Sequence, residues 1–282
     1  MRYENPQLPE GANYSHDHPL KELLVLLVGA LAVVVVAVFA LAAAAGWLAT
    51  KIPFETEQAW AAGLAERLPA STLSADEQAA QQRLQAMVDR IAALQDLPAG
   101  MSPVVHLTGD AQVNAFATLG GHLFVTRGIL ADMPHENALV TVLAHEVAHV
   151  KHRDPVVALG RGVAVMAALG ALSGVGDGGV VANQLGNAGL LTTLTFNRDQ
   201  ERAADDEALR TLDRWYGYTA GAADLFRVLE RAAAGHEPPA FMSTHPATAE
   251  RIARMREAET PGPLLPLPAE ITAFLAAGPP KE

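Results

Sequence analysis

The chain has no cysteine among its 282 residues. This absence excludes disulfide bonds, a thiol nucleophile, and any zinc or iron–sulfur site with cysteine ligands. The chain also has no basic tract, since its 20 lysines and arginines are outnumbered by 31 acidic residues and the net charge is −11. A groove for nucleic acid needs a basic surface, so no nucleic-acid partner is expected.

Charge is also missing from residues 23–49, a run of 27 uncharged and almost entirely apolar positions. A helix of this length is about 40 Å long, whereas the hydrocarbon core of a bilayer is about 30 Å thick. Lys21 and Lys51 flank the run, and Trp47 lies where an interfacial anchor would. We expect an uncleaved transmembrane anchor that contacts the lipid bilayer. The alternatives are a buried core helix and a cleaved signal peptide, whose apolar part would be only about 7–15 residues long.

The anchor divides the chain into a tail over residues 1–22, a large domain over residues 52–259 and a proline-rich tail over residues 260–282. A short leading tail before a large domain favours a single-pass protein whose domain is translocated. We expect a bacterial inner membrane with the domain on the periplasmic side, although the single lysines at the two ends give the positive-inside rule little to weigh. The sequence sets no oligomeric state.

The apolar spacing predicts an α+β fold that is mainly helical with a small β-sheet. We expect Ser74 and Asp132 to cap helices, Asp154–Pro155 to end the second of these, and Gly120–Gly121 to reverse the chain between two strands. Residues 156–179 are interpreted as a buried helix and a glycine loop, with a membrane hairpin as the alternative. Helices are predicted over residues 57–68, 76–94, 133–151, 195–212, 219–234 and 246–259, and strands over residues 104–107, 112–118 and 121–126.

The predicted helix over residues 133–151 contains His145-Glu146-Val147-Ala148-His149. Histidines at positions i and i+4 lie about 40° apart and one turn apart, so both rings can reach one ion at about 2.0–2.1 Å. Glu146 lies about 100° round the helix, too far to ligate but placed to contact a water at the ion. The motif can occur by chance, but its uncharged flanks favour a buried and dry metal site.

A catalytic zinc site needs a third protein ligand and a free position for water. Glu201 is the best candidate for this ligand, and Asp205 shares its helix face four residues on. The small Ala204 would let two helices approach closely, so that Asp205 accepts the second ring N–H of a ligating histidine. An isolated acidic helix is more often a solvated face. The upstream histidine motif reverses that preference for these two residues.

These motifs together resemble the HtpX-like membrane zinc peptidases, a family that includes the CAAX prenyl protease. The resemblance covers about residues 75–256 and departs from the family pattern at Asn197, often a serine, and at Tyr218-Thr219-Ala220, where Asp-Pro is more usual. The extra membrane helices of HtpX between the two zinc motifs are not expected here. The residues that carry the resemblance are His145-Glu146-x-x-His149, Glu201-x-x-Ala204-Asp205, Val113–Phe116, Gly120–Leu130, and Thr244-His245-Pro246 with Arg251.

The fold implied by the resemblance is a zincin-like metalloprotease domain behind one transmembrane helix. One Zn²⁺ per chain would be held by His145, His149 and Glu201, with a net charge of +1 that suits a developing oxyanion. Glu146 would take the proton of the attacking water and pass it to the departing amine. The resemblance further implies that His245 and Arg251 stabilise the tetrahedral intermediate, and that in some members the matching histidine swings onto zinc as an inhibitory ligand. The alternatives are a helix-start residue for His245 and a solvated Arg251.

We expect residues 121–126 to form an edge strand beside the site, and an interior strand is the alternative. An extended polypeptide could pair with the edge strand through backbone hydrogen bonds and so bind with little sequence preference. This suits an endopeptidase for unfolded or damaged membrane and envelope proteins. The competing functions are a non-proteolytic chaperone or scaffold that binds clients at the same cleft, which the intact Glu146 argues against, and a structural anchor without metal. The proposed substrate strand consists of Gly121, His122, Leu123, Phe124 and Val125.

Overall fold

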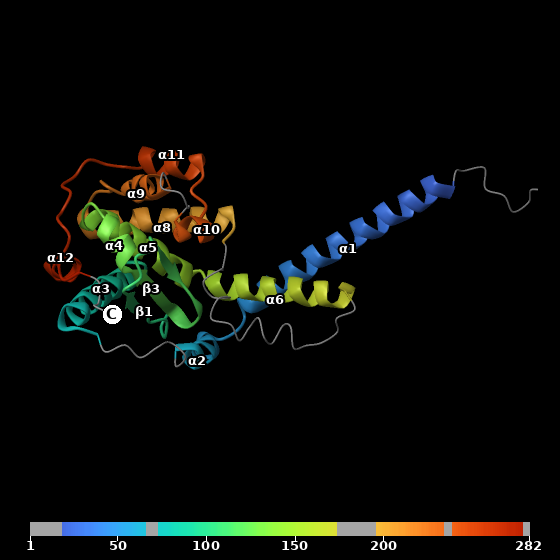
Figure 1. The fold of residues 1–282 in the computed structure, drawn as a ribbon, viewed down its shortest axis with the longest axis horizontal. Coiled ribbons are helices and arrows are strands. Elements are labelled where there is room, and N and C mark those ends of the chain that lie inside the picture. Colours follow the sequence, from blue (N-terminus) through green and yellow to red (C-terminus); the bar gives the residue numbers. More distant parts are fainter. Residues whose placement is uncertain (1–18, 66–72, 174–195, 234–238, 279–282) are drawn as a thin grey trace, which may run out of the picture.

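A computed structural model describes residues 19–65, 73–173, 196–233 and 239–278 of the chain. Two long helices, α1 (Pro19–Ala49) and α6 (Asp154–Ser173), project together from a body of helices and one small sheet (Figure 1). The predicted α+β fold, mainly helical with a small sheet, is thereby confirmed. Parts of six predicted segments lie outside the described residues, namely residues 1–18, 66–68, 174–179, 195, 234 and 279–282.

The sheet consists of β1 (Val104–Thr108), β2 (Ala115–Ala117) and β3 (His122–Thr126), in the order β1-β3-β2. β3 pairs in parallel with β1 and antiparallel with β2. The prediction that residues 121–126 form an edge strand is therefore wrong. A tight turn that contains Gly120 and Gly121, with φ angles of 72° and 81°, folds β3 back onto β2, and β1 from earlier in the chain occupies its other side.

The far edge of the sheet, along β1, is closed by side chains of α3 (Ala75–Leu94). The N–H of Val105 donates to Gln85 Oε1 at 2.8 Å, and the N–H of Leu107 donates to Gln81 Oε1 at 3.2 Å. α3 itself begins at Ser74, which forms the predicted cap as a capping box with Glu77. Among the described strands, β2 is left as the sheet edge that faces the helices.

Helix α5 (Glu136–Lys151) lies at the centre of the body, and 15 of its 16 residues are buried. Its start differs from the prediction, because Asp132 belongs to the preceding helix α4 (Arg127–Asp132) and His135 caps α5 by accepting the N–H of Ala138. Asp154–Pro155 also differs from the prediction, since a two-residue turn follows α5 and these residues begin α6. Proline fits the first turn of a helix because its missing N–H needs no partner there.

The remaining helices enclose α5 and the sheet. Much of the tail after residue 260 is an ordered wrap, because Arg127 donates to the carbonyls of Phe274 and Leu275 at 3.0 and 2.7 Å and Ile271 is fully buried. Helix α11 starts later than predicted, because Thr248 caps it. The helices around α5 and the sheet whose bounds have not yet been given are α2 (Phe54–Ala65), α8 (Arg198–Tyr216), α9 (Asp224–Ala233), α10 (Ala240–Thr244), α11 (Ala249–Glu257) and α12 (Ala269–Ala276).

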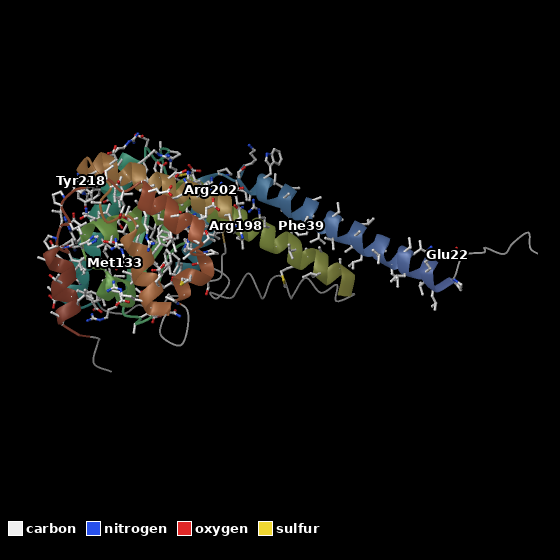
Figure 2. The ribbon with its side chains drawn as sticks, turned by 90° about the horizontal axis from the view of Figure 1, so that it is seen from above. Glu22, Phe39, Met133, Arg198, Arg202 and Tyr218 are labelled. Atoms are coloured by element: carbon white, nitrogen blue, oxygen red, sulfur yellow. The ribbon has the colours of Figure 1, made fainter. Side chains whose placement is uncertain are left out.

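Helices α1 and α6 run side by side in opposite directions, away from the body (Figures 1 and 2). They approach closely at small residues, since a Cβ added at Gly160 would lie 3.1 Å from the Ala45 carbonyl oxygen and 3.1 Å from Ala49 Cβ. The prediction of a buried helix is confirmed only for the start of α6, where Val156 and Val157 are 1% and 6% exposed, whereas the rest of α6 is mostly only partly buried and lies along α1. By length and composition alone, both helices could cross a membrane.

Candidate metal centre

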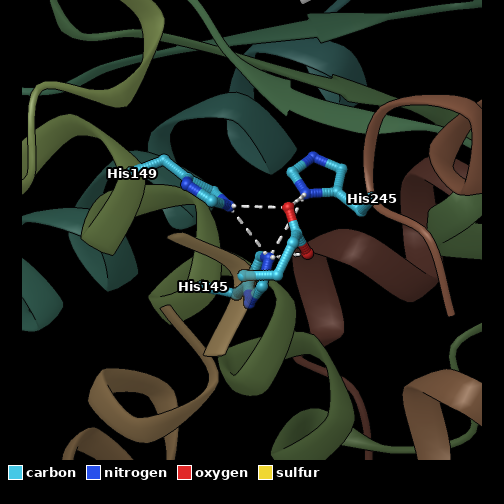
Figure 3. A group of neighbouring side chains, drawn as sticks. His145, His149 and His245 are labelled. Carbon is cyan, nitrogen blue, oxygen red and sulfur yellow. Dashed lines mark hydrogen bonds and ion pairs between the residues drawn. The ribbon is translucent and has the colours of Figure 1, made fainter. Parts of the chain in front are cut away.

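The two histidines of the His-Glu-x-x-His motif are buried on α5, with 1% of His145 and none of His149 exposed. Their Nε2 atoms lie 3.1 Å apart, and their rings meet edge to face at 82°. Both rings point to the same spot from successive turns of the helix, as Figure 3 shows. The spacing of the motif and the burial of α5 thus present two imidazole nitrogens to one dry position.

Glu201 reaches this position from the first turn of α8. Asn197 caps α8 by accepting the N–H groups of Asp199 and Gln200, so the asparagine that departs from the family pattern still fulfils a capping role. Ala204 is fully buried, which fits the predicted close approach of α8 to α5. Glu201 Oε1 lies 3.6 Å from His149 Nε2, and Glu201 Oε2 lies 3.5 Å from His145 Nε2.

His245, at the end of α10, completes the cluster (Figure 3). Its Nδ1 lies 2.9 Å from Glu201 Oε1 and 3.3 Å from His145 Nε2. One ligand atom from each of the four residues lies within 4.8 Å of all the others. Ligands at about 2.0–2.1 Å from a tetrahedral ion are about 3.3 Å apart. The spacing and the nitrogen and oxygen donors therefore fit a divalent metal.

Glu146 lies beside this cluster and is 1% exposed. Its Oε2 accepts the N–H of Ala117 in β2 at 2.8 Å, whereas its Oε1 has no hydrogen-bond partner among the described residues and lies 3.5 Å from His245 Nε2. Burial raises the pKa of Glu146 to about 8, although the nearby His145 opposes this shift. One oxygen is thus fixed to the edge strand and the other is free to exchange a proton.

Asp205 supports His145 from behind. Its Oδ1 lies 3.1 Å from His145 Nδ1, and both of its oxygens accept hydrogen bonds from Arg251 at 2.7 Å. Burial alone would lower the pKa of His145, but hydrogen bonds to Asp205 and Glu201 outweigh it and raise the pKa to about 10. The carboxylates therefore favour a positive charge at this position, which a metal cation would supply.

Arg251 is 5% exposed and lies inside this network. It forms an ion pair with Glu201 Oε2 in addition to its two hydrogen bonds to Asp205, and its Nη1 donates to the carbonyl of Pro246 at 3.0 Å. The alternative of a solvated Arg251 is wrong. All the residues singled out for chemistry on α5, α8, α10 and α11 are brought together, whereas the predicted substrate strand lies one strand further away.

Three buried residues at this centre were not predicted. Asp154 Oδ2 lies 2.8 Å from His149 Nδ1, so each motif histidine has its own carboxylate. Phe196 stacks on His149 with ring centroids 4.1 Å apart, and Phe241 stacks on His245 at 4.5 Å. Of these three residues, only Asp154 could have been suspected from the sequence. It follows His149 by five residues, so it can contact that histidine if the helix ends directly after the motif.

A His-Glu-x-x-His helix, a glutamate ligand from a second helix and a carboxylate beside an edge strand define a metallopeptidase. The sequence pattern described as "Peptidase family M48" matches residues 78–259, which is more than half of the chain. The chain therefore belongs to peptidase family M48. The predicted membership of a family of membrane zinc peptidases is confirmed.

Curated relatives of this family are similar over the same part of the chain. "Mitochondrial metalloendopeptidase OMA1" of Schizosaccharomyces pombe is 35% identical over 165 residues, covering 56% of this chain and 48% of that protein. "Protease HtpX homolog" of Salinibacter ruber is 30% identical over 207 residues, covering 61% and 72%. "Beta-barrel assembly-enhancing protease" of Escherichia coli is 28% identical over 165 residues, covering 53% and 33%. The chain thus spans about half of the first of these proteins and a third of the last.

Proposed function

We propose that the protein is a membrane-anchored zinc endopeptidase. The observation that carries this proposal is the convergence of His145, His149 and Glu201 on one buried position, with Glu146 next to it on the side of β2. These three residues would hold the ion, and zinc suits two imidazoles and one carboxylate. When bound, zinc would lower the pKa of a water to about 7 and polarise the scissile carbonyl.

Glu146 is the general base of the proposed reaction. Its Oε1 has no hydrogen-bond partner in the described part of the chain, while Oε2 is held by the N–H of Ala117. A carboxylate with a pKa raised toward neutrality accepts a proton from water more readily than an ordinary glutamate and can return it to the departing amine. The hydrogen bond to β2 keeps the base aligned with the strand along which the substrate would lie.

His245 would be a fourth ligand of the ion, since its Nδ1 lies 2.9 Å from Glu201 Oε1 and it belongs to the same cluster. It would then take the place of the attacking water, because a catalytic zinc site keeps one position free for water. In the proposed reaction, His245 would move away with α10 to give an open state that admits the water. In the open state, His245 and Arg251 are the nearest groups that could stabilise developing negative charge, as the family resemblance implies.

The substrate is proposed to pair with β2 and not with β3. β3 is interior, and its Leu123 and Val125 side chains are buried against the core, so Gly121 to Val125 have no free backbone edge for a peptide. β2 carries the contact to Glu146 through Ala117. A polypeptide added along β2 would bind mainly through its main chain and with little sequence preference.

The membrane placement and the cellular role complete the proposal. Apolar residues of α1 are widely exposed, for instance Phe39 at 72% and Trp47 at 65%, and such a surface needs an apolar cover that lipid supplies. We propose a single-pass protein with residues 23–49 in a bacterial inner membrane and the body on the periplasmic side. Unfolded or damaged membrane and envelope proteins are the proposed substrates, in line with the relatives named as proteases.

Casein digestion by the full-length protein in detergent micelles tests this proposal. We expect cleavage that stops when a chelator removes the metal and returns when zinc is added back. Binding of casein without cleavage, with one zinc per chain present, would instead support the chaperone or scaffold function. A chain that binds no metal would overturn both the enzyme and its site.

A further inference from the structure

The carboxylate of Asp154 is clamped between the metal helix and α8. Its Oδ2 lies 2.8 Å from His149 Nδ1, and its Oδ1 accepts a hydrogen bond from Gln200 Nε2 at 2.6 Å. Asp154 is 4% exposed and His149 is fully buried. Because a carboxylate can only accept, His149 Nδ1 must carry the proton, and Nε2 is left with its lone pair facing the cluster.

Asp154 is also the first residue of α6. Its position is thus set by the helix that runs along α1 and not by the body alone. The two helices touch at glycines, since a Cβ at Gly46 would lie 2.9 Å from Arg161 Nε and a Cβ at Gly160 would lie 3.1 Å from Ala49 Cβ. Helix α6 therefore cannot shift along or away from α1 without carrying Asp154 with it.

A second set of contacts holds the start of α6 to the segment that follows the anchor. Arg153, with a φ of 61°, donates to the carbonyl of Ile52 at 3.0 Å and to Glu57 Oε2 at 2.9 Å. Glu57 Oε1 in turn accepts the N–H of Gly120, in the turn before β3, at 2.9 Å. Two residues that follow the anchor, Ile52 and Glu57, thus hold Arg153, the residue next to Asp154.

We propose that Asp154 is a positioning residue for His149, and that packing of α6 on α1 sets its place, so that the pair of helices α1 and α6 is a structural part of the metal centre. The inference rests on the proposed metal role of His149. A hydrogen bond of 2.8 Å loses most of its strength when the heavy atoms separate beyond about 3.5 Å. A displacement of α6 of about 1 Å is therefore enough to release the ring of His149.

The first test measures the zinc affinity of the full-length protein in detergent, by competition with a chromophoric chelator. The wild type must bind zinc, and a wild type without zinc would refute the proposed function itself. We expect Asp154→Ala to bind zinc about 10- to 100-fold more weakly. Asp154→Glu, which keeps a carboxylate, should recover part of this loss, and the absorption spectrum of the Co²⁺-loaded protein should change in Asp154→Ala.

The matched control removes another carboxylate next to the site. Asp206 on α8 pairs with Arg254 and touches no residue of the cluster, so Asp206→Ala should bind zinc like the wild type. Circular dichroism shows whether each variant is folded. Wild-type zinc affinity and an unchanged Co²⁺ spectrum in folded Asp154→Ala would overturn the role of Asp154.

The second test addresses the helix pair and leaves the metal centre untouched. Gly160→Leu must push α6 away from Ala45 and Ala49, whereas Gly162→Leu on the same helix meets nothing within 4 Å. We expect Gly160→Leu to weaken zinc binding severalfold and Gly162→Leu to leave it unchanged; Gly160→Ala is the milder substitution if the leucine variant does not fold. Equal affinities for the position-160 and position-162 variants would overturn the coupling to α1.

Discussion

The two halves of the metal centre are supported in different ways. His145 rests on Asp205, which Arg251 holds with two hydrogen bonds of 2.7 Å, so all of its support comes from helices of the body. His149 rests on Asp154, which is held by the neutral amide of Gln200 and begins the helix that packs on the anchor. One half is thus a charged and self-contained network, and the other half depends on the membrane-facing part of the chain.

Substitution of Glu146 should have the largest effect on activity, because Glu146 is the proposed general base and lies beside both halves of the metal centre. Glu146→Gln keeps the size and the hydrogen bond to Ala117 but cannot take a proton. We expect casein cleavage to fall by about 10²–10⁴-fold. Metal analysis should still find about one zinc per chain, since neither half of the ligand support is changed. Retained cleavage would refute the role of Glu146.

Loss of Arg251 should lower the stability of the charged half of the metal centre. Arg251→Ala leaves Asp205 and Glu201 buried without their cation, which costs about 3–5 kcal/mol when one partner of a buried pair is removed. We expect a lower Tm for the metal-free protein and a smaller loss when zinc is bound, because the metal replaces part of the missing charge.

Arg254→Ala is the control for this experiment. Arg254 lies one turn further along α11 and pairs with the half-exposed Asp206, so its removal should cost only about 0–1 kcal/mol. If the Tm of Arg251→Ala equals that of Arg254→Ala, the charged half does not carry the stability that its geometry indicates.

The pH dependence of activity should report on the base between the two halves. Glu146 must be deprotonated to accept a proton, and burial raises its pKa to about 8 from an ordinary value of 4.5, while a nearby divalent cation would lower it again. Activity should therefore fall as the pH falls, with the midpoint of the acid limb of kcat/KM between 4.5 and 8. A midpoint at or below 4.5, with zinc retained, would contradict the buried base.

Removal of Gln200 should give the smallest effect and sharpen the contrast with Arg251. Gln200→Ala takes one hydrogen bond from Asp154 but leaves its contact to His149. A loss of about 1 kcal/mol corresponds to about fivefold weaker zinc binding. Gln200 has a second role, because its Oε1 accepts the N–H of Asn197 at 3.0 Å in the cap of α8. Asn197→Ala disturbs this cap without touching Asp154 and therefore separates the two roles. Equal zinc affinities for these two variants would assign the effect to the cap.

The sequence was sufficient to predict the features that depend on local spacing. Ser74 caps α3 where the pattern places a helix start, and the i and i+4 histidines share one face of α5. Glu201 could be paired with that helix because a catalytic zinc site needs a third ligand, and Asp205 because it lies on the same helix face as Glu201. The predicted reversal at Gly120–Gly121 also follows from local preference, since both residues have positive φ angles.

Features that depend on contacts distant in sequence were not predictable in the same way. A strand such as β3 has the same pattern at an edge as in the interior, and only its parallel pairing with β1 decides the matter. An apolar helix such as α6 reads alike whether it packs in a core or along another apolar helix. Asp154 reaches His149 because the turn after α5 places Arg153 at a positive φ, which its residue type does not favour.

The two glutamines that cover β1 have a consequence for the proposed binding of unfolded polypeptides. A sheet with two exposed edge strands could pair with another chain at the edge away from the site and so promote aggregation. Gln81 and Gln85 accept hydrogen bonds from the outward-facing N–H groups of β1, so a further strand can pair only with β2, the edge strand next to Glu146. In the proposed reaction, a polypeptide that pairs with the sheet would therefore lie beside the catalytic glutamate.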